Sequence, residues 1–126
     1  MREYKRLGDA ELEIMLIIWK AQEPVGSVYI HERLKKNRKW ALSTLMSTLE
    51  RLVKKGFVYC DRSTGNNLYS PLIMEDEYKA RESRSFIEKL FGNSFGELVT
   101  TLYDSKSIDS EDLRELRELI DKLEEK

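Results

Sequence analysis

The stretch that decides the fold is residues 43–71, which read STLMSTLERLVKKGFVYCDRSTGNNLYSP. Its first half repeats apolar residues at helical spacing, at Leu45, Leu49 and Leu52, and predicts a helix that ends at Gly56. In its second half the period changes to two, so residues 57–60 and 68–70 predict the strands of a hairpin. We expect Pro71 to stop the second strand.

Two further helices are predicted upstream of this stretch. Residues 9–21 place Ile14, Ile18 and Trp19 on one helical face, and residues 27–34 continue the pattern after a short extended piece. A linker over residues 37–42 leads to the helix that starts at Ser43. Three helices followed by a hairpin predict a mainly α fold with a small β-hairpin wing, the winged form of the helix-turn-helix.

The chain beyond this module is predicted to be helical over residues 75–91, 94–103 and 110–125. We therefore expect a DNA-binding domain over residues 1–72 and a helical dimerisation domain over residues 73–126. The C-terminal apolar stripes have little core of their own, and short isolated helices are marginal in water, so they need a partner. The residues expected to bury themselves in a homodimer are Phe86, Leu90, Phe95, Leu98, Leu102, Leu113, Leu116 and Ile120.

The charge of the chain is unevenly distributed. The net charge of -1 divides into +5 over residues 1–72, with 13 Lys and Arg against 8 Asp and Glu, and -6 over residues 73–126, with 9 against 15. A basic half joined to an acidic half indicates that the first half meets a polyanion.

Composition also excludes several classes of protein. A single cysteine, Cys60, and a single histidine, His31, are too few for a zinc site, so we expect no metal and no cofactor. With one histidine and no Gly-rich phosphate loop, the sequence does not predict an enzyme. The first six residues are too charged for a signal peptide, and no apolar run is long enough to span a membrane. We therefore expect a cytoplasmic protein that does not bind membranes directly.

In a helix-turn-helix the second helix of the pair enters the major groove, so its outer face should contact DNA. We also expect Thr48 on or near that face. Lysines and arginines before the helix and in the wing could contact the phosphate backbone. Simpler roles stay open: Ser43 as a helix cap, Arg51 in a salt bridge, Asn66 as a turn former. The expected DNA-contacting residues are Ser43, Thr44, Ser47, Arg51, Arg38, Lys39, Arg62 and Asn66.

Several segments of the sequence are similar to segments of the penicillinase repressors of the BlaI/MecI/CopY type. The resemblance extends over essentially the whole chain. The matching segments are LGDAELEIM at 7–15 with Ile18-Trp19, then Trp40, STL at 43–45, LERLVKKGF at 49–57 and YSPL at 69–72. The resemblance implies a homodimer on a pseudo-palindromic operator, with one winged domain per half-site and dimerisation through the C-terminal helices.

The sequence also departs from this family at some positions, and the resemblance implies a mode of inactivation. Met46 stands where relatives often have a basic residue, and Gly65-Asn66-Asn67 replaces a wing that more often holds a cation, so weaker DNA binding than usual is predicted. Several members are inactivated by cleavage in the C-terminal part, triggered by a membrane sensor with a metalloprotease domain. By position the scissile bond here would be Thr101–Leu102.

The sequence therefore predicts a dimeric transcriptional repressor that binds duplex DNA. Two alternatives stay open. The acidic C-terminal half and the isoelectric point near 6.0 are compatible with a winged-helix protein-interaction module that binds no DNA. A repressor released by a small ligand in the dimer interface would instead form a tight complex with a metabolite.

Overall fold

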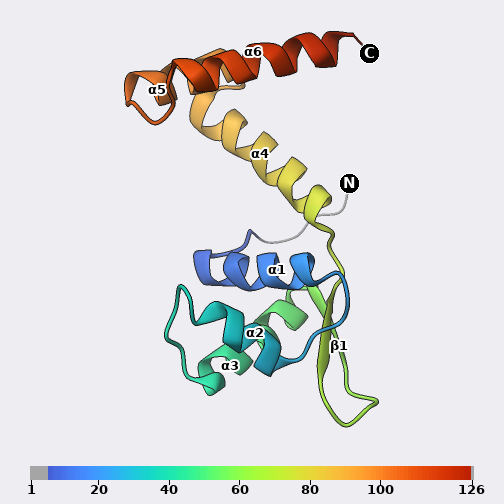
Figure 1. Ribbon diagram of the computed structural model, residues 1–126. Coiled ribbons are helices and arrows are strands. Elements are labelled where there is room, and N and C mark those ends of the chain that lie inside the picture. Colours follow the sequence, from blue (N-terminus) through green and yellow to red (C-terminus); the bar gives the residue numbers. More distant parts are fainter. Residues whose placement is uncertain (1–5, 126) are drawn as a thin grey trace. The chain divides into compact units, whose positions relative to one another are not determined.

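The computed structural model describes residues 6–125, and it divides into two compact units, residues up to Arg81 and residues from Glu82 onward. Residues 1–5, which argued against a signal peptide, lie outside the described part. The elements are α1 (Asp9–Ala21), α2 (Ser27–Leu34), α3 (Leu42–Lys54), β1 (Val58–Asp61), β2 (Leu68–Pro71), α4 (Glu75–Phe91), α5 (Phe95–Asp104) and α6 (Ser110–Glu124) (Figure 1). The predicted fold class, mainly α with a β-hairpin wing, is confirmed.

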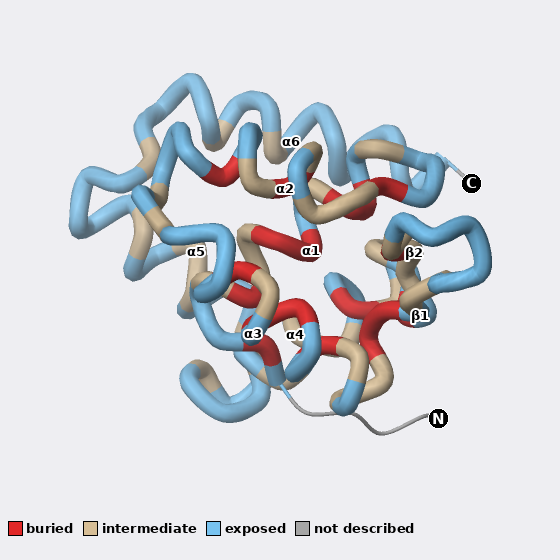
Figure 2. Tube along the Cα trace, turned by 90° about the horizontal axis from the view of Figure 1, so that it is seen from below, coloured by how far each residue is buried: buried red, intermediate tan, exposed pale blue. Residues whose placement is uncertain are grey.

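The first unit is built around one apolar core. Ile14, Met15 and Ile18 of α1 are buried, as are inward-facing residues of α2, α3 and the hairpin (Figure 2). Each helix buries residues three or four positions apart, which is the spacing that places side chains on one helical face. The remaining buried apolar residues of the core are Leu7, Trp19, Val25, Ile30, Leu34, Leu45, Leu49, Leu52, Phe57, Val58, Tyr69, Ile73 and Tyr78.

The turn from α3 into the hairpin depends on a glycine, as the sequence predicted. Gly56 has a φ of 82°, a left-handed conformation that is open to glycine without strain. The Gly56 N–H donates to the Val53 carbonyl and the Phe57 N–H to the Leu52 carbonyl, both at 3.0 Å, so the last carbonyls of α3 are satisfied. Phe57 then enters the core as the first residue after the turn.

The wing is an antiparallel hairpin in which Val58 pairs with Pro71 and Cys60 with Tyr69. Pro71 lies inside β2 rather than after it, so the second strand is one residue longer than predicted. The extended piece before α2 adds a bridge on the other side of β2, because Val25 and Tyr69 exchange N–H···O bonds of 3.0 and 2.7 Å. This bridge attaches the base of the wing to the segment between α1 and α2.

The expected domain boundary at Leu72 differs from the division in the structure, which falls inside α4. Ile73 and Tyr78 are 1% and 4% exposed, because both belong to the core of the first unit. The Trp19 indole N–H donates to the Ile73 carbonyl at 2.9 Å, and the Tyr78 hydroxyl accepts from the Leu7 N–H at 3.1 Å. The first turns of α4 are therefore part of the first unit, residues up to Arg81, which we call the winged unit.

The second unit comprises the rest of α4 with α5 and α6. Ser94 caps α5 by accepting from the Glu97 N–H at 3.1 Å, and Asp109 caps α6 by accepting from the Asp112 N–H at 3.0 Å. Phe86 and Phe91 make an edge contact, with ring centroids 5.8 Å apart. No described residue of α5 or α6 is buried, so neither helix covers its apolar side chains within the single chain.

Candidate nucleic-acid interface

The helix-turn-helix consists of α2, α3 and the segment that joins them. Nε2 of His31, on α2, lies 2.7 Å from the carbonyl oxygen of Trp40, just before α3. This hydrogen bond fixes the connecting segment against α2. His31 therefore has a structural role.

One face of α3 is turned away from the core and is available for contact. Ser43, Thr44, Ser47 and Arg51 are all exposed, as the sequence predicted. Ser43 does not cap the helix, because Ala41 occupies the N-cap position and Ser43 lies one residue inside α3. Its hydroxyl is therefore not used as the helix N-cap. The structure thus brings the four residues of α3 that we expected to contact DNA onto one accessible surface.

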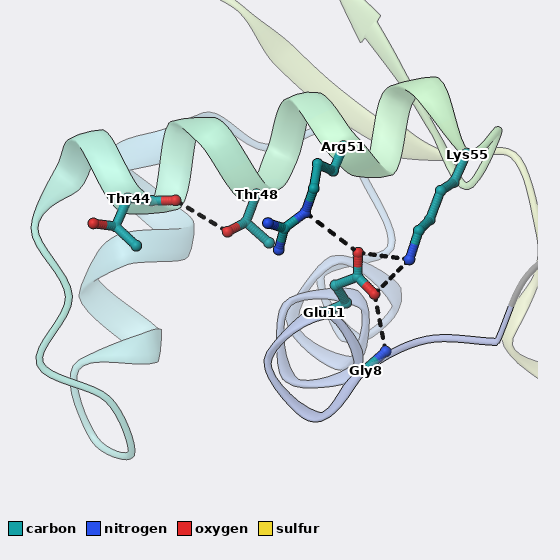
Figure 3. Close-up of polar contacts among 6 residues, drawn as sticks. All are labelled: Gly8, Glu11, Thr44, Thr48, Arg51 and Lys55. Carbon is teal, nitrogen blue, oxygen red and sulfur yellow. Dashed lines mark hydrogen bonds and ion pairs between the residues drawn. The ribbon is translucent and has the colours of Figure 1, made fainter.

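The prediction that Thr48 lies on or near this face is wrong. Thr48 is 2% exposed, and its hydroxyl donates to the Thr44 carbonyl at 3.0 Å (Figure 3). Its position, four residues after Thr44, is turned toward the interior rather than toward solvent. A threonine hydroxyl can be buried in a helix when it bonds to the carbonyl one turn earlier, so burial here leaves no polar group unsatisfied.

A buried carboxylate at the junction of α1 and α3 was not anticipated. Glu11, on α1, is 5% exposed and accepts the Gly8 N–H at 2.9 Å. Nζ of Lys55 lies 2.8 and 2.9 Å from its two oxygens, and Nε of Arg51 lies 3.8 Å from Oε2 (Figure 3). An acidic residue in the first turn of a helix is ordinary, so nothing in the sequence indicates these contacts.

The pKa of Glu11 reflects opposing effects. Burial raises it, but the Lys55 hydrogen bond, the Gly8 N–H and the charges of Lys55 and Arg51 together hold the pKa below its usual value. Glu11 is therefore ionised at neutral pH. Its negative charge balances the positive charge of Lys55, whose side chain is 24% exposed. The Arg51 side chain, by contrast, is 62% exposed on the outer face of α3.

The two expected contacts before α3 differ in their surroundings. Nε of Arg38 is bound to the Glu13 carboxylate on α1, and its guanidinium lies 5.6 Å from the Trp40 ring. Lys39 is exposed. Arg38 must therefore share its charge with Glu13, whereas Lys39 can extend toward a phosphate.

The tip of the wing is held by its own polar side chains. The Asp61 carboxylate accepts from the Ser63 N–H and hydroxyl at 2.9 and 2.7 Å, and these bonds lower the pKa of Asp61. The Thr64 hydroxyl donates to the Asn66 carbonyl at 3.1 Å. The side chains of Arg62 and Asn66 are exposed on this ordered turn, as a wing contact requires.

Sequence reasoning missed one exposed residue of α3. Glu50 follows Met46 and Ser47 by one helical turn and is exposed between them and Lys54. Its spacing from Ser43 and Ser47 places it on the outer face. It was omitted because only hydroxyl, amide and basic side chains were expected to contact DNA. Within residues 6–125 Glu50 makes no ion pair.

The residues expected to dimerise lie in the second unit and are incompletely covered. Phe86, Leu90, Phe95 and Ile120 are 42, 63, 51 and 44% exposed. Four others, Leu98, Leu102, Leu113 and Leu116, are half-buried. The expected cleavage bond, Thr101–Leu102, lies inside α5.

The part of the chain that the structure describes shows neither a metal-binding cluster nor a membrane-spanning helix. Over residues 6–125, no three His, Cys, Asp or Glu side chains are grouped so as to hold a metal ion. The same residues include no helix with the length and apolar character needed to cross a membrane.

The structure is similar to the DNA-binding domain of a known repressor. The solution structure of monomeric BlaI of Bacillus licheniformis, in complex with the blaP half-operator, matches with a TM-score of 0.53 and 32% identity. The match covers 62% of this chain and 94% of that one. A solution structure of the DNA-binding domain of the repressor BlaI matches with the same TM-score, identity and coverage.

Two curated relatives match over nearly the whole chain. The methicillin resistance regulatory protein MecI of Mammaliicoccus sciuri is 30% identical over 118 residues, covering 92% of this chain and 94% of the relative. The penicillinase repressor of Bacillus licheniformis is 26% identical, covering 96% and 94%. The family model of the penicillinase repressors matches residues 7–122. The chain thus belongs to the penicillinase repressor family.

Proposed function

We propose that this protein is a dimeric transcriptional repressor that binds a pseudo-palindromic operator in duplex DNA, one winged unit per half-site. The observation that carries the proposal is the accessible outer face of α3, with Ser43, Thr44, Ser47 and Arg51 exposed on a helix-turn-helix. The solved complex of the related BlaI with a half-operator supports DNA as the ligand. The function is binding and not catalysis, and it belongs in the cytoplasm, where the DNA is.

On the DNA side, α3 enters the major groove. The hydroxyls of Ser43, Thr44 and Ser47 bind phosphates or base edges, and the exposed guanidinium of Arg51 binds a phosphate or a guanine. Lys39 and Arg38 before α3, and Arg62 and Asn66 in the wing, contact the backbone on either side. Because the outer face of α3 has few cations, we expect DNA affinity to be modest. Each phosphate that the flanking lysines and arginines neutralise should add about 0.9 to the magnitude of the slope of log K against log salt.

Dimerisation is proposed for the second unit. Its helices leave apolar side chains exposed in the single chain, among them Leu90 at 63% and Phe95 at 51%. Burial of such surface stabilises an interface by roughly 25 cal/mol per Å² of apolar area removed from water, which favours a second copy as the cover. Two linked winged units also bind two half-sites with a gain from effective concentration.

Release of the operator by proteolysis is the finer part of the proposal. The Thr101–Leu102 bond lies in the last turns of α5, and the Leu102 carbonyl accepts the N–H groups of Ser107 and Ile108 at 2.9 and 3.3 Å. A protease binds its substrate extended, so this end of α5 must unwind before cleavage. A protease linked to a membrane sensor is the proposed partner. Mass spectrometry of the chain after induction would locate the cut, and an intact chain would exclude this route.

The experiment that tests DNA binding is selection of duplexes from a random-sequence pool at near-physiological salt, followed by sequencing. Enrichment of a two-fold symmetric motif is the expected result. A correctly folded dimer that enriches no sequence would favour a protein-interaction module instead. A tight complex with a metabolite that releases DNA would favour the ligand-responsive alternative.

A further inference from the structure

The outer face of α3 carries a carboxylate near its middle. Ser43, Ser47, Glu50 and Lys54 follow one another at steps of four, three and four residues, so they form one stripe along the helix. Met46, three residues after Ser43 and four before Glu50, lies along the same stripe. Met46 is half-buried and the other four are exposed. The stripe presents hydroxyls at the start of α3, Glu50 one turn after Ser47, and a cation at the end.

Glu50 differs in its surroundings from two carboxylates of α1. Glu11 is held by Lys55, and Glu13 is held by Arg38, so the charge of each is balanced inside the protein. Lys54 lies four residues after Glu50, the spacing that favours an ion pair on a helix, yet the two do not pair. Across residues 6–125, no hydrogen bond or ion pair engages the Glu50 carboxylate, which is therefore available to a ligand.

An ionised carboxylate on a DNA-facing helix is repelled by phosphates, so it is favourable only where the groove offers a donor. Carboxylate oxygens only accept hydrogen bonds. In the major groove the donors are the N4 amino group of cytosine and the N6 amino group of adenine. Adenine places the N7 acceptor beside its amino group, which repels a carboxylate, whereas the cytosine edge offers only the donor. Cytosine is therefore the base that suits Glu50.

We propose that Glu50 is a specificity-determining residue, which accepts a hydrogen bond from the N4 amino group of a cytosine in the major groove of each half-site. This inference rests on the proposed function, because it requires α3 to lie in the groove. It assigns to Glu50 a preference for one base, where the hydroxyls of Ser43 and Ser47 are less selective.

The test compares the full-length protein with Glu50→Gln in the same duplex selection. A glutamine amide both donates and accepts, so it fits the N7 and N6 groups of adenine together. We expect the wild type to enrich a cytosine at two symmetric positions and Glu50→Gln to enrich adenine there. For two duplexes that differ only at this base pair, we expect the wild type to bind the cytosine duplex about tenfold more tightly and Glu50→Gln to bind the adenine duplex about tenfold more tightly.

Two further variants serve as controls. Glu23→Gln makes the same change of charge at an exposed residue after α1, and it should retain the wild-type motif. Glu50→Ala should lose the cytosine preference without gaining one for adenine. Because Glu50 is exposed and unpaired in the described structure, both Glu50 variants should melt at the wild-type temperature.

Distinct results would overturn the inference. If Glu50→Gln enriches the wild-type motif and binds all duplexes more tightly by one common factor, Glu50 only repels phosphates. A wild-type motif with no cytosine that responds to Glu50 would also refute it. If the wild type itself enriches no motif, the proposed function fails before Glu50 is in question.

Discussion

Glu11 and Lys55 form a two-oxygen ion pair between the first turn of α1 and the residue that follows α3. Nζ of Lys55 lies 2.8 Å from Oε1 and 2.9 Å from Oε2 of a carboxylate that is 5% exposed. Oε1 also accepts the Gly8 N–H, so one carboxylate caps α1 and fixes the end of α3. The orientation of α3, which carries the proposed DNA contacts, is thereby tied to α1.

Replacing Glu11 with glutamine should lower the free energy of unfolding by about 1–3 kcal/mol, because hydrogen bonds to a buried charged group are lost. Thermal or urea unfolding measures the difference. Glu32→Gln is the matched control, since Glu32 pairs with Lys35 on the surface, where ion pairs contribute little. Equal losses in both variants would mean that the contacts of Glu11 are not special.

The effect of Glu11 should depend on pH in one direction. Its pKa is lowered from 4.5 on folding, so its contribution to stability is complete above about pH 4.5 and is lost as the pH falls through the lower folded-state value. The difference in unfolding free energy between the wild type and Glu11→Gln should therefore be constant from pH 7 to 5 and shrink below pH 4.5. Urea unfolding across this range checks it, and a difference that grows in acid would contradict it.

Arg51→Ala should weaken operator binding while leaving the melting temperature nearly unchanged. The Arg51 side chain is 62% exposed and its Nε is 3.8 Å from Glu11, and exposed pairs of this kind stabilise proteins little. If Arg51 binds a phosphate, the slope of log K against log salt should fall in magnitude by about 0.9. Lys79→Ala, which removes a cation paired with Glu75 on α4, should leave DNA affinity unchanged. A large loss of stability in Arg51→Ala would show that Arg51 is structural.

Ile120→Glu should shift the protein toward monomer. Ile120 is 44% exposed in the single chain, and a charge at this position would be buried without a partner if α6 meets a second copy. Sedimentation at micromolar concentration measures the change. Arg114→Gln alters the net charge by the same amount at an exposed position of α6 outside the apolar stripe, and this variant should stay dimeric. Dimers of equal strength in both variants would remove Ile120 from the interface.

Tyr78→Phe should destabilise the winged unit by about 1–3 kcal/mol. The change leaves the Leu7 N–H, which donates to the Tyr78 hydroxyl at 3.1 Å, without its buried acceptor. Tyr59→Phe is the control, because the Tyr59 side chain is 55% exposed and its hydroxyl can bond to water. Thermal unfolding of the two variants gives the comparison, and an unchanged melting temperature in Tyr78→Phe would mean that water replaces the bond.

The local features of the fold could be predicted from the sequence because they depend on neighbouring residues. The spacing of Ile14, Ile18 and Trp19 predicted α1 over the residues it occupies, and the change of period after Gly56 predicted the hairpin. The exposed positions of Ser43, Ser47 and Arg51 followed from the same periodicity. The predicted end of β2 was wrong by one residue, because pairing with Val58 extends the strand to Pro71.

What the sequence alone determined is the order of helices and strands, the apolar face of each, and the family resemblance, because these depend on residue types at short separations. The tertiary structure decided which polar residues are paired and where the units divide. Glu11 and Lys55 are 44 positions apart, and Tyr78 and Leu7 are 71 apart. No periodicity links such pairs. Only the tertiary packing of the chain brings them within hydrogen-bond distance, and in the folded chain Thr48 is buried while Glu50 is exposed.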